Sequence, residues 1–360
     1  MKALVLEEKG LLTFKEVNEP EPFGEKPVLV RIAAVGVCGS DIIRYAQGKV
    51  YHLPLILGHE FSAIVEETPQ NSKFSRGDRV AVYPLIPDYQ DPFSRIGEYN
   101  VSSGYDYFGS RRDGAFAERL YVPETNLIRI SAHIPLLHAA VGEPAAVALH
   151  GVRKFKLPAN ATALVIGGGP IGALAAQWLR ILGCSQIFVS DVDQKKCDIL
   201  SKMGFYIINA AKQNTVSAIM DRTSRKGVDC TVEGCGIPQT FIQAIESAGI
   251  FGQVLILGDV NGEVLLKDSL ITTILRRELT LYGTWNSKIM PTYNSEWDMV
   301  FSHMGKSLQI APLISHTPSL REGPSFFSDM ASKRIWYNKV VFAISEEAKL
   351  EINSGNVYNL

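Results

Sequence analysis

The sequence predicts an α/β protein that combines a β-rich domain with a second domain built on a doubly wound parallel sheet. The first observation is a change of pattern near residue 161, where short β-rich segments give way to apolar strands alternating with helical stretches. The second is a glycine-rich turn directly after the first of these apolar strands. A chain of 360 residues is long enough for two domains that each bury their own core.

Residues 1 to about 150 consist of short apolar segments separated by Gly, Pro, Asn and Asp, which favours β-structure. The segment 28–35 is the clearest strand there, and helical periodicity is scarce. Farther along the chain we expect strands at 163–166, 186–190, 228–233 and 253–257. The helical stretches between them indicate a parallel sheet, because parallel strands need crossover connections.

Composition and charge argue against several classes of partner. A net charge of -1, with 20% charged and 46% hydrophobic residues, is typical of a globular protein that nucleic acid and anionic membranes do not attract. The apolar N-terminal segment is interrupted by Glu7 and Glu8, which leaves it too short for a secretory signal. No apolar run approaches the length that crosses a bilayer, so we expect no membrane partner and a cytoplasmic location.

The five cysteines lack the close, regular spacing of a disulfide scaffold. In a reducing compartment they are expected to be free thiols or metal ligands. Cys184, Cys197, Cys230 and Cys235 lie beside apolar segments, so the sequence predicts that these four are small buried packing residues.

A glycine-rich turn follows the predicted strand 163–166. It comprises Gly167, Gly168, Gly169, Pro170, Ile171 and Gly172, and the residues after it have helix-forming composition. Gly167 permits the tight turn, Gly169 lets the backbone approach a pyrophosphate, and Gly172 allows the helix to pack closely on the strand. The helix N-terminus offers amide donors to phosphates. The position between strand and helix favours a dinucleotide site over a purely structural turn, with Pro170 and Ile171 included among the cofactor-binding residues.

Asp191 ends the next predicted strand, about 20 residues beyond the turn. A carboxylate at this position accepts hydrogen bonds from a ribose hydroxyl and repels a 2'-phosphate. The expected cofactor is therefore NAD. Lys195 and Lys196 lie just beyond Asp191 and would soften this preference, although a solvated helix surface explains them as well.

Candidate metal ligands lie in short motifs of the β-rich part. Cys38 and the adjacent pair His59 and Glu60 each stand next to glycines, and Glu143 precedes the nucleotide-binding region. One thiolate, one imidazole and nearby carboxylates form a tetrahedral zinc set with room for an exchangeable ligand. Spacing alone leaves packing roles open for a single Cys and a single His.

Motifs along the chain strengthen the metal interpretation. They are Cys38-Gly39-Ser40-Asp41, Gly58-His59-Glu60, Gly77-Asp78-Arg79-Val80, Gly114-Ala115-Phe116-Ala117-Glu118 and Glu143-Pro144. With these motifs, in this order, the chain resembles the zinc-containing medium-chain dehydrogenase/reductase family from its N-terminal strand to about residue 344. The segments 105–114 and 275–285 look most like the family's polyol dehydrogenases, in particular those acting on galactitol 1-phosphate.

The resemblance implies a GroES-like catalytic domain formed by residues 1–151 and 286–360, with a Rossmann NAD-binding domain at 152–285. It also implies a homodimer or homotetramer paired through the edge of the nucleotide-domain sheet. The segments 250–257 and 279–282 are candidate contributors, though buried central strands would read the same.

Carried over by motif, Cys38 and His59 are ligands of one catalytic zinc ion, and Glu60 is a direct ligand. Glu143 is a ligand or holds one through water, and Glu60 and Glu143 are expected to exchange places during turnover. Asp41 matches a position that orients a ligand from behind, with loop stabilisation as the alternative.

One departure from the family concerns a second, structural zinc ion that four cysteines bind in many relatives. The corresponding positions here are Asp88, Asp91, Ser94 and Ser102. Hydroxyls and carboxylates are poor substitutes for four thiolates. We expect no structural zinc, and a lobe at 87–110 that is more mobile or held by subunit contacts.

The resemblance implies hydride transfer between a secondary alcohol of a small polyol and NAD, with zinc as the Lewis acid. Ser40 is the expected relay of the released proton, with a local turn cap as its alternative role. A phosphorylated substrate requires cations, for which Arg44 and then Arg111 are candidates. Trp285 is a candidate wall of the substrate pocket, and core packing would explain it equally well.

Further substrate candidates are Arg112 and Lys288, and Tyr51 is a second candidate wall of the pocket, with core packing as its alternative. For Arg44, Arg111, Arg112 and Lys288, surface exposure or an ion pair is an equally good explanation. Two other functions stay open. One is oxidation of an unphosphorylated polyol such as sorbitol or a pentitol, and the other is a zinc-free nucleotide-binding relative without alcohol dehydrogenase activity.

Overall fold

The computed structural model describes residues 1–289 and 295–353. Contacts within the chain divide it into two compact units, Met1–Glu143 with Lys288–Leu360 as the first and Pro144–Ser287 as the second. The predicted catalytic-domain segment 286–360 therefore includes residues 290–294 and 354–360, which lie outside the described residues. Among the described residues, no helix combines the length and apolar character needed to span a bilayer.

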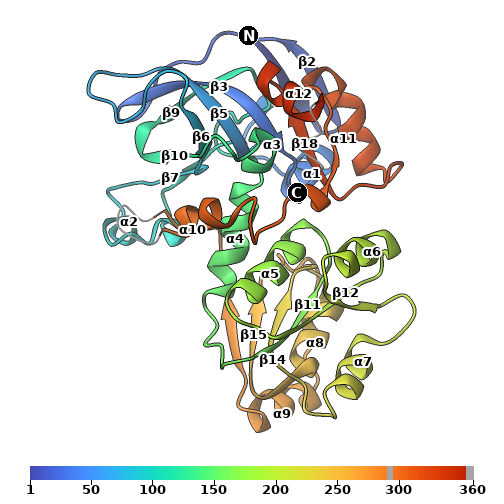
Figure 1. The fold of residues 1–360 in the computed structure, drawn as a ribbon. Helices are drawn as coiled ribbons and strands as arrows, with labels where there is room; N and C mark the ends of the chain where they lie inside the picture. Colours follow the sequence, from blue (N-terminus) through green and yellow to red (C-terminus); the bar gives the residue numbers. More distant parts are fainter. Residues whose placement is uncertain (290–294, 354–360) are drawn as a thin grey trace. The chain divides into compact units, whose positions relative to one another are not determined.

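The second unit is a six-stranded parallel sheet in the order β13-β12-β11-β14-β15-β16 (Figure 1). Its strands are β11 (Thr162–Ile166), β12 (Gln186–Asp191), β13 (Tyr206–Asn209), β14 (Val228–Glu233), β15 (Ala248–Ile256) and β16 (Thr280–Gly283). Strands β11, β12, β14 and β15 cover the four segments expected from the apolar runs. The strand order reverses between β11 and β14, which makes this the switch point where doubly wound sheets bind ligands.

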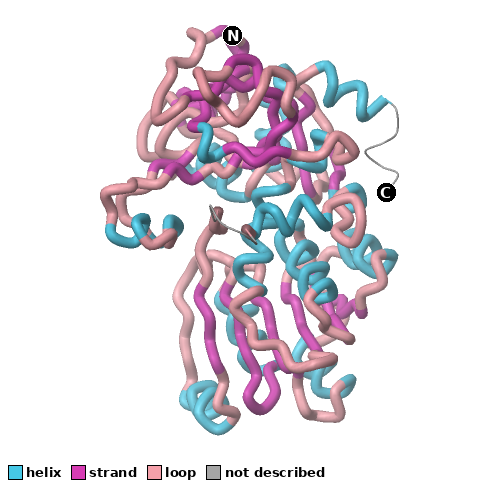
Figure 2. Tube along the Cα trace, turned by 60° about the vertical axis from the view of Figure 1, so that its left-hand side comes forward, coloured by secondary structure: helices cyan, strands magenta, loops and turns pink. Residues whose placement is uncertain are grey.

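Helices cover this sheet, as Figure 2 shows for the strands of the second unit and the helices along them. They are α5 (Pro170–Ile181), α6 (Gln194–Lys202), α7 (Thr215–Arg222), α8 (Pro238–Ser247) and α9 (Asp268–Arg276). Helix α5 packs on β11 and β12, whereas α8 packs on β11, β14 and β15. Apolar side chains from both layers, including Leu164, Phe188 and Ile245, form the buried core.

The first unit is rich in short strands. They are β1 (Lys2–Glu8), β2 (Leu11–Glu16), β3 (Pro27–Gly36), β4 (Leu55–Ile56), β5 (Glu60–Glu67), β6 (Arg79–Val82), β7 (Leu85–Ile86), β8 (Asp106–Tyr107), β9 (Arg119–Pro123), β10 (Leu127–Arg129), β17 (Ile314–His316) and β18 (Lys339–Ala343). The largest sheet has the order β10-β6-β5-β3-β18-β17, with β9 also paired to β3. Strand β3 contains the predicted strand 28–35.

The first unit also contains helices. They are α1 (Gly39–Gln47), α2 (Pro92–Arg95), α3 (Leu136–Ala139), α10 (Glu296–His303), α11 (Gly323–Ala331) and α12 (Glu346–Asn353). Helix α4 (Gly142–Val152) begins in the first unit and continues into the second. Helices α1 and α4 were not expected, because the sequence shows little helical periodicity in this part of the chain.

The strand register at the centre of the largest sheet positions the candidate site. Strand β3 lies between β5 and β18, and both neighbours run antiparallel to it. At its last residue, Gly36 lies opposite Glu60 of β5 on one side and Val341 of β18 on the other. The chain then turns from β3 through Cys38 into helix α1.

The burial of the cysteines differs in part from expectation. Cys184, Cys197 and Cys230 are buried, as predicted from their apolar neighbours. The prediction was wrong for Cys235, which is exposed. Cys235 lies in the loop after β14, outside the sheet, so the apolar strand before it did not determine its burial.

Candidate active site

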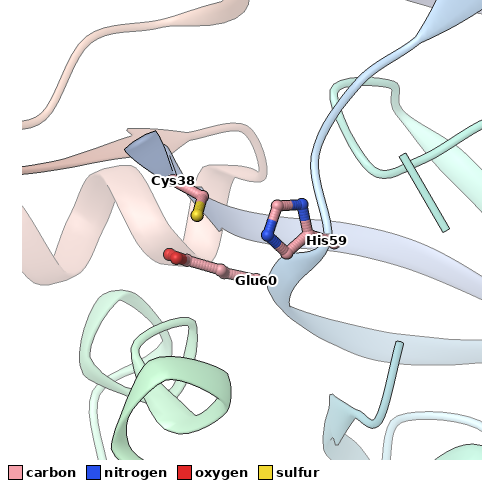
Figure 3. Close-up of side chains that lie close together, drawn as sticks. All are labelled: Cys38, His59 and Glu60. Carbon is pink, nitrogen blue, oxygen red and sulfur yellow. The ribbon is translucent and has the colours of Figure 1, made fainter. Parts of the chain in front are cut away.

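Three residues predicted as zinc ligands come together where β3 ends and β5 begins. One potential ligand atom from each of Cys38, His59 and Glu60 lies within 4.8 Å of the other two. Figure 3 shows the Cys38 sulfur, the Glu60 carboxylate and one ring nitrogen of His59 pointing toward a common space. His59 and Glu60 are buried, with 4% and 2% of their surface exposed.

Gly58 allows the chain to place His59 and Glu60 in this position. Its φ of 96° is one that L side chains rarely adopt. A Cβ at position 58 would also lie 2.8 Å from Cδ2 of Phe116, so the packed ring leaves no room for one. The glycine before the predicted ligand pair is therefore a steric requirement of the turn.

The donor set fits a catalytic zinc ion. Sulfur, imidazole nitrogen and carboxylate oxygen are the ligand types that zinc takes in proteins, and catalytic zinc sites hold the ion with three protein ligands. In residues 1–289 and 295–353, Cys38, His59 and Glu60 form the one group of three such side chains with this spacing.

Asp41 organises this group from the first turn of α1. Its carboxylate accepts a hydrogen bond from the Cys38 backbone N–H at 3.1 Å, and its Oδ1 lies 3.5 Å from Nδ1 of His59. Asp41 is fully buried, which by itself would raise its pKa, but His59, Arg44 and the Cys38 N–H hold the pKa below its ordinary value. A carboxylate in this position orients an imidazole ligand.

The electrostatics of His59 reflect its acidic neighbours. Burial alone would lower the pKa of His59, but the neighbouring Asp41 and Cys38 raise it well above its ordinary value. A metal ion bound by the same ring would satisfy the same surplus of negative charge.

Glu143, the fourth residue predicted at the metal, lies beside this group without meeting its spacing. It accepts a hydrogen bond from the Tyr107 hydroxyl at 3.1 Å, and the Tyr107 ring packs on His59 with 5.6 Å between ring centroids. Burial raises the pKa of Glu143 to about 7, against an opposing effect of His59. Its role as a ligand, direct or through water, stays a prediction.

The glycine-rich turn of the second unit has the geometry expected of a phosphate cradle. Gly167 has a φ of 100°, and its N–H donates to the carbonyl oxygen of Ser190 at 2.8 Å. A Cβ at position 172 would overlap the carbonyl oxygen of Gly167. Gly169 is the N-cap of α5, with Pro170 as the first helical residue, and a Cβ added at 169 would meet no atom within 4 Å.

Asp191 points back to this turn from the end of β12. Its Oδ2 accepts a hydrogen bond from the Gly168 N–H at 2.6 Å, and its Oδ1 accepts one from the Asp193 N–H at 2.8 Å. Asp193 in turn caps α6 through the backbone N–H groups of Lys195 and Lys196. The structure thus brings the predicted ribose carboxylate and the predicted phosphate turn together.

Family models match both units of the chain. Residues 24–132 match the alcohol dehydrogenase GroES-like domain, and residues 170–304 match the zinc-binding dehydrogenase domain. Galactitol 1-phosphate 5-dehydrogenase of Escherichia coli strain K12 is 31% identical over 340 residues, covering 92% of this chain and 96% of that protein. The chain belongs to the zinc-containing medium-chain dehydrogenase/reductase family. It is an oxidoreductase of the alcohol dehydrogenase type.

Other relatives agree with this family. D-xylulose reductase of Saccharomyces cerevisiae is 28% identical over 339 residues, covering 91% of this chain and 93% of that protein. The crystal structure of galactitol-1-phosphate dehydrogenase from Escherichia coli superposes with a TM-score of 0.89 at 29% identity, covering 95% of this chain and all of that one. A structure from Sinorhizobium meliloti 1021, described as a zinc-binding dehydrogenase bound to NADP, has a TM-score of 0.87 at 29% identity, covering 95% and 98%. The predicted family and fold class are confirmed.

Ser40 and Arg44 of this dehydrogenase interact on the first turns of α1. The Arg44 guanidinium donates to Oγ of Ser40 at 2.8 Å and lies 3.4 Å from Oδ1 of Asp41. Arg44 is therefore linked both to the candidate proton relay and, through Asp41, to His59. The ion-pair alternative for Arg44 is present, and it places the cation next to the metal-site residues.

The other substrate candidates have partners of their own. The Arg111 guanidinium lies over the rings of Tyr105 and Tyr51, at 4.3 and 5.2 Å from their centroids, and donates to the Tyr105 carbonyl. The Tyr105 ring contacts the Tyr107 ring, which leads to Glu143. Trp285 lies in the second unit and is 53% exposed, so it is not a core residue. Its place beside a substrate stays a prediction.

Arg112 and Lys288 both form ion pairs. Arg112 pairs with Asp106 at 3.0 Å, and Lys288 pairs with Glu98. The ion-pair explanation offered for these residues from the sequence holds for both.

In the lobe at 87–110, two of the positions that are cysteines in many relatives form local hydrogen bonds. Asp91 caps the short helix α2 by accepting from the Phe93 N–H at 2.8 Å, and it also binds Ser103. Asp88 accepts from the Gln90 N–H at 2.9 Å. Both carboxylates therefore have turn and cap functions.

Two residues beside the metal-site group were not assigned roles from the sequence. Tyr107 binds Glu143 and packs on His59, although its segment was noted only for its family resemblance. Lys339 is buried and contacts Glu60. A lysine at the start of an apolar strand gives no signal of this contact, because the contact depends on pairing with a strand about 300 residues earlier in the chain.

Proposed function

We propose that this dehydrogenase transfers hydride between a polyol and NAD and interconverts a secondary alcohol and a ketose, with a hexitol phosphate such as galactitol 1-phosphate as the substrate. The observation that carries the proposal is the convergence of Cys38, His59 and Glu60 within 4.8 Å of one another. The relative from Escherichia coli strain K12 supports the substrate class, since it is 31% identical over nearly the whole chain.

The Cys38 sulfur, a ring nitrogen of His59 and the Glu60 carboxylate would hold the zinc ion. The contact of Nδ1 with Asp41 leaves Nε2 of His59 for the metal. Glu143 would complete the set directly or through water, in exchange with Glu60. Zinc supplies Lewis acidity toward the substrate hydroxyl.

Ser40 is suited to pass on the proton that the substrate hydroxyl loses. The Arg44 guanidinium donates to Oγ of Ser40 and occupies one of its acceptor lone pairs. The hydroxyl hydrogen of Ser40 remains available for donation, and the second lone pair remains available for acceptance. These are the two properties that a relay requires.

The cofactor in this proposal is NAD, which accepts the hydride. Gly169 leaves room for its pyrophosphate at the N-terminus of α5, while Gly167 and Gly172 allow the tight turn and the close packing of the helix. Asp191 supports NAD over NADP, because its carboxylate would repel a 2'-phosphate. The Sinorhizobium meliloti structure is bound to NADP, so both cofactors belong in the assay.

A second candidate is a dehydrogenase of an unphosphorylated polyol. The yeast D-xylulose reductase favours it, since 91% of this chain matches that relative. Arg44 favours the phosphorylated substrate, because it is a cation joined directly to the candidate relay Ser40.

The test measures reduction of NAD and NADP with hexitols, pentitols and their phosphates, with and without a chelator. We expect the highest kcat/KM with a hexitol phosphate and NAD, and loss of activity with the chelator. A higher kcat/KM for a free pentitol or hexitol would favour the second candidate. Activity that survives complete metal removal would contradict the zinc mechanism.

Metal analysis of the purified chain provides an independent readout. We expect about one zinc ion per chain, which Cys38→Ser loses and Cys197→Ser retains. Cys197 is a suitable control because it is a buried cysteine of the other unit. No bound zinc would favour a zinc-free relative, and about two ions per chain would contradict the expected absence of a structural site.

Self-association through the second unit is part of the proposal. Strand β16 is an edge of the parallel sheet, and Leu281 on it is 37% exposed. Ile250, Phe251 and Leu275 of the same unit are each about 70% exposed, at 71%, 68% and 70%. Edge strands with exposed apolar neighbours pair with other chains unless they are protected. We propose a homodimer or homotetramer formed at this edge.

A further inference from the structure

Lys339 is a buried lysine next to the candidate metal site. Its side chain is 3% exposed, and its Nζ contacts Oε2 of Glu60, whose side chain is 2% exposed. The same Nζ donates to the carbonyl oxygen of Val37 at 2.9 Å. Lysine is almost never fully buried unless it is paired, so the contact with Glu60 is the reason that Lys339 is tolerated here.

The strand register explains how this pair forms. Gly36 at the end of β3 lies opposite Glu60 on one side and Val341 on the other. Lys339 is two residues before Val341 in β18, so its side chain lies on the same face of the sheet as that of Val341. Glu60 lies on this face too, because Gly36 is opposite both Val341 and Glu60. The side chains of Glu60 and Lys339 meet over Gly36.

Gly36 supplies the space for this meeting. A Cβ at position 36 would overlap Oε2 of Glu60 and would lie 3.1 Å from Cε of Lys339. The absence of a side chain at Gly36 is therefore a condition for the ion pair between Glu60 and Lys339. The sheet, its register and a missing side chain together keep Lys339 within reach of Glu60.

The Glu60 carboxylate therefore has two possible partners, a metal ion and the ammonium of Lys339. It is one of the three potential ligands in the group with Cys38 and His59. It is also the acidic partner of a buried ammonium. A metal ion bound to Glu60 and the ammonium of Lys339 would be two cations close together in a buried site, where repulsion is stronger than in water.

We propose that Lys339 is a positioning residue that competes with the metal for the Glu60 carboxylate and so weakens the hold of Glu60 on zinc. This inference rests on the proposed zinc site and deepens it. By offering Glu60 a second partner, Lys339 makes it easier for the carboxylate to leave the metal. Without Lys339, Glu60 would be a buried carboxylate with zinc as its best partner.

A purely structural role for the ion pair predicts a different change in zinc affinity. If Lys339 only held the strands together, removing its charge would disturb the site and weaken zinc binding or leave it unchanged. If Lys339 competes with zinc, removing its charge strengthens zinc binding. The direction of the change in zinc affinity therefore separates the two explanations.

The test compares Lys339→Met and Lys339→Gln with Lys339→Arg in the full chain. Met keeps the length of the apolar stem, Gln keeps a donor for Val37 and Glu60, and Arg keeps the positive charge. Zinc affinity is measured by competition with a chromophoric chelator. We expect both neutral variants to bind zinc at least about tenfold more tightly than the wild type, and Lys339→Arg to stay within about threefold. Lys349→Met, a change at an exposed lysine of helix α12, serves as the matched control and should leave zinc affinity unchanged.

Thermal unfolding gives a second readout that does not depend on activity. Without metal, the neutral variants should melt at a lower temperature than the wild type, because Glu60 loses its buried partner. Zinc should then raise their melting temperature more than it raises that of the wild type. If Lys339→Met fails to fold, Lys339→Gln still provides the measurement, because its side chain retains a hydrogen-bond donor.

The possible outcomes separate this inference from the proposed function. If the wild type binds zinc and both neutral variants bind it equally well or more weakly, Lys339 does not compete for Glu60. If Lys339→Arg tightens zinc binding as much as the neutral variants, charge is not the cause and the inference also fails. If the wild type binds no zinc at all, the proposed metal site itself is wrong.

Discussion

In the proposed mechanism, Arg44 would link the charge of a phosphorylated substrate to proton transfer. Its guanidinium contacts both Ser40 and Asp41, and its side chain is 18% exposed. The remaining donors of the guanidinium are available to a phosphate group, because Arg presents five N–H donors in a fixed fork. A substitution at this position should therefore have two effects that substrate choice can separate.

Replacing Arg44 with Ala should raise the KM for a hexitol phosphate by about tenfold or more, since a charge-assisted hydrogen bond contributes about 1.5–3 kcal/mol. The KM for the corresponding free hexitol should change much less. The kcat should fall for both substrates, because Ser40 loses its donor. Steady-state kinetics with the two substrates measures both effects. Equal changes in KM would remove Arg44 from phosphate binding and leave only its contact with Ser40.

Short motifs predicted the central residues of the candidate metal site. Cys38 and His59 each stand next to a glycine in the sequence, Glu60 follows His59 directly, and the structure brings the three within 4.8 Å. Lys339 and Tyr107 were not predicted, because their contacts depend on side-chain positions that strand pairing and ring packing create. A sequence pattern describes neighbours along the chain, and these two residues act on partners far from them in the sequence.

At the scale of elements, the turn from β11 into α5 allows two glycines to be compared. A Cβ at position 172 would overlap the carbonyl oxygen of Gly167, whereas a Cβ at position 169 would meet nothing within 4 Å. The φ of Gly169 is -66°, which any residue adopts. The two substitutions should therefore fail for different reasons.

Gly172→Ala should lower the melting temperature and weaken NAD binding, because α5 must move away from the turn. Gly169→Ala should leave the melting temperature of the nucleotide-free protein nearly unchanged and still weaken NAD binding by about tenfold or more, since a methyl group displaces the pyrophosphate. Calorimetric titration with NAD and thermal unfolding measure the two quantities. Normal NAD affinity in Gly169→Ala would place the pyrophosphate elsewhere.

The C-terminal helix α12 is held to the β-rich unit by ionic contacts. Arg31 binds Glu347 with two hydrogen bonds of 2.8 Å, and Arg79 lies 2.9 Å from Glu351. The hydrogen bond from Arg31 lowers the pKa of Glu347 to about 2. Because the folded-state pKa lies below the ordinary value of 4.5, this pair stabilises the fold above pH 4.5 and loses its effect as the pH falls toward 2.

Glu347→Gln should therefore lower the free energy of unfolding at pH 7 and have a smaller effect at pH 3. The expected loss at pH 7 is at most about 1 kcal/mol, since Glu347 is partly exposed and solvent screens the pair. Denaturant titrations of both proteins at the two pH values give the comparison. A difference that stays constant between pH 7 and pH 3 would show that the ion pair is not the cause.

Elements were predictable where one pattern determined the backbone. The predicted strand 228–233 has the same bounds as β14, because an apolar run between a glycine and a Gly-Cys-Gly segment leaves little choice. Strand β15 begins five residues earlier than predicted, at Ala248, since Gly249 and Gly252 weaken the apolar pattern there. Helix α1 was not predicted, because it starts with Gly, Ser and Asp, residues that also favour turns.

At the scale of the whole molecule, the discontinuous first unit could not be derived from local patterns. The chain leaves this unit within α4 and returns to it at Lys288. The pairing of β18 with β3 closes the unit across about 300 residues of sequence. Such long-range pairing leaves no periodic signal, so its expectation came from family resemblance.

The edges of the parallel sheet lead to a prediction about assembly. Strands β16 and β13 form the two edges of the same sheet, and each presents an exposed side chain, Leu281 at 37% and Tyr206 at 55%. Ile250 lies on β15, which pairs with β16, and Leu275 lies on α9, which precedes β16 in the chain; both are exposed, which favours the β16 edge for pairing with a second copy. A lysine on an edge strand opposes such pairing.

Leu281→Lys should therefore reduce the mass in solution by half or more, whereas Tyr206→Lys should leave it unchanged. Size-exclusion chromatography with light scattering measures the mass, and circular dichroism checks that both variants are folded. The comparison is matched, because each variant places the same charge on an edge strand of the same sheet. A loss of mass in Tyr206→Lys alone would assign assembly to the opposite edge, and a wild type with the mass of one chain would exclude the oligomer.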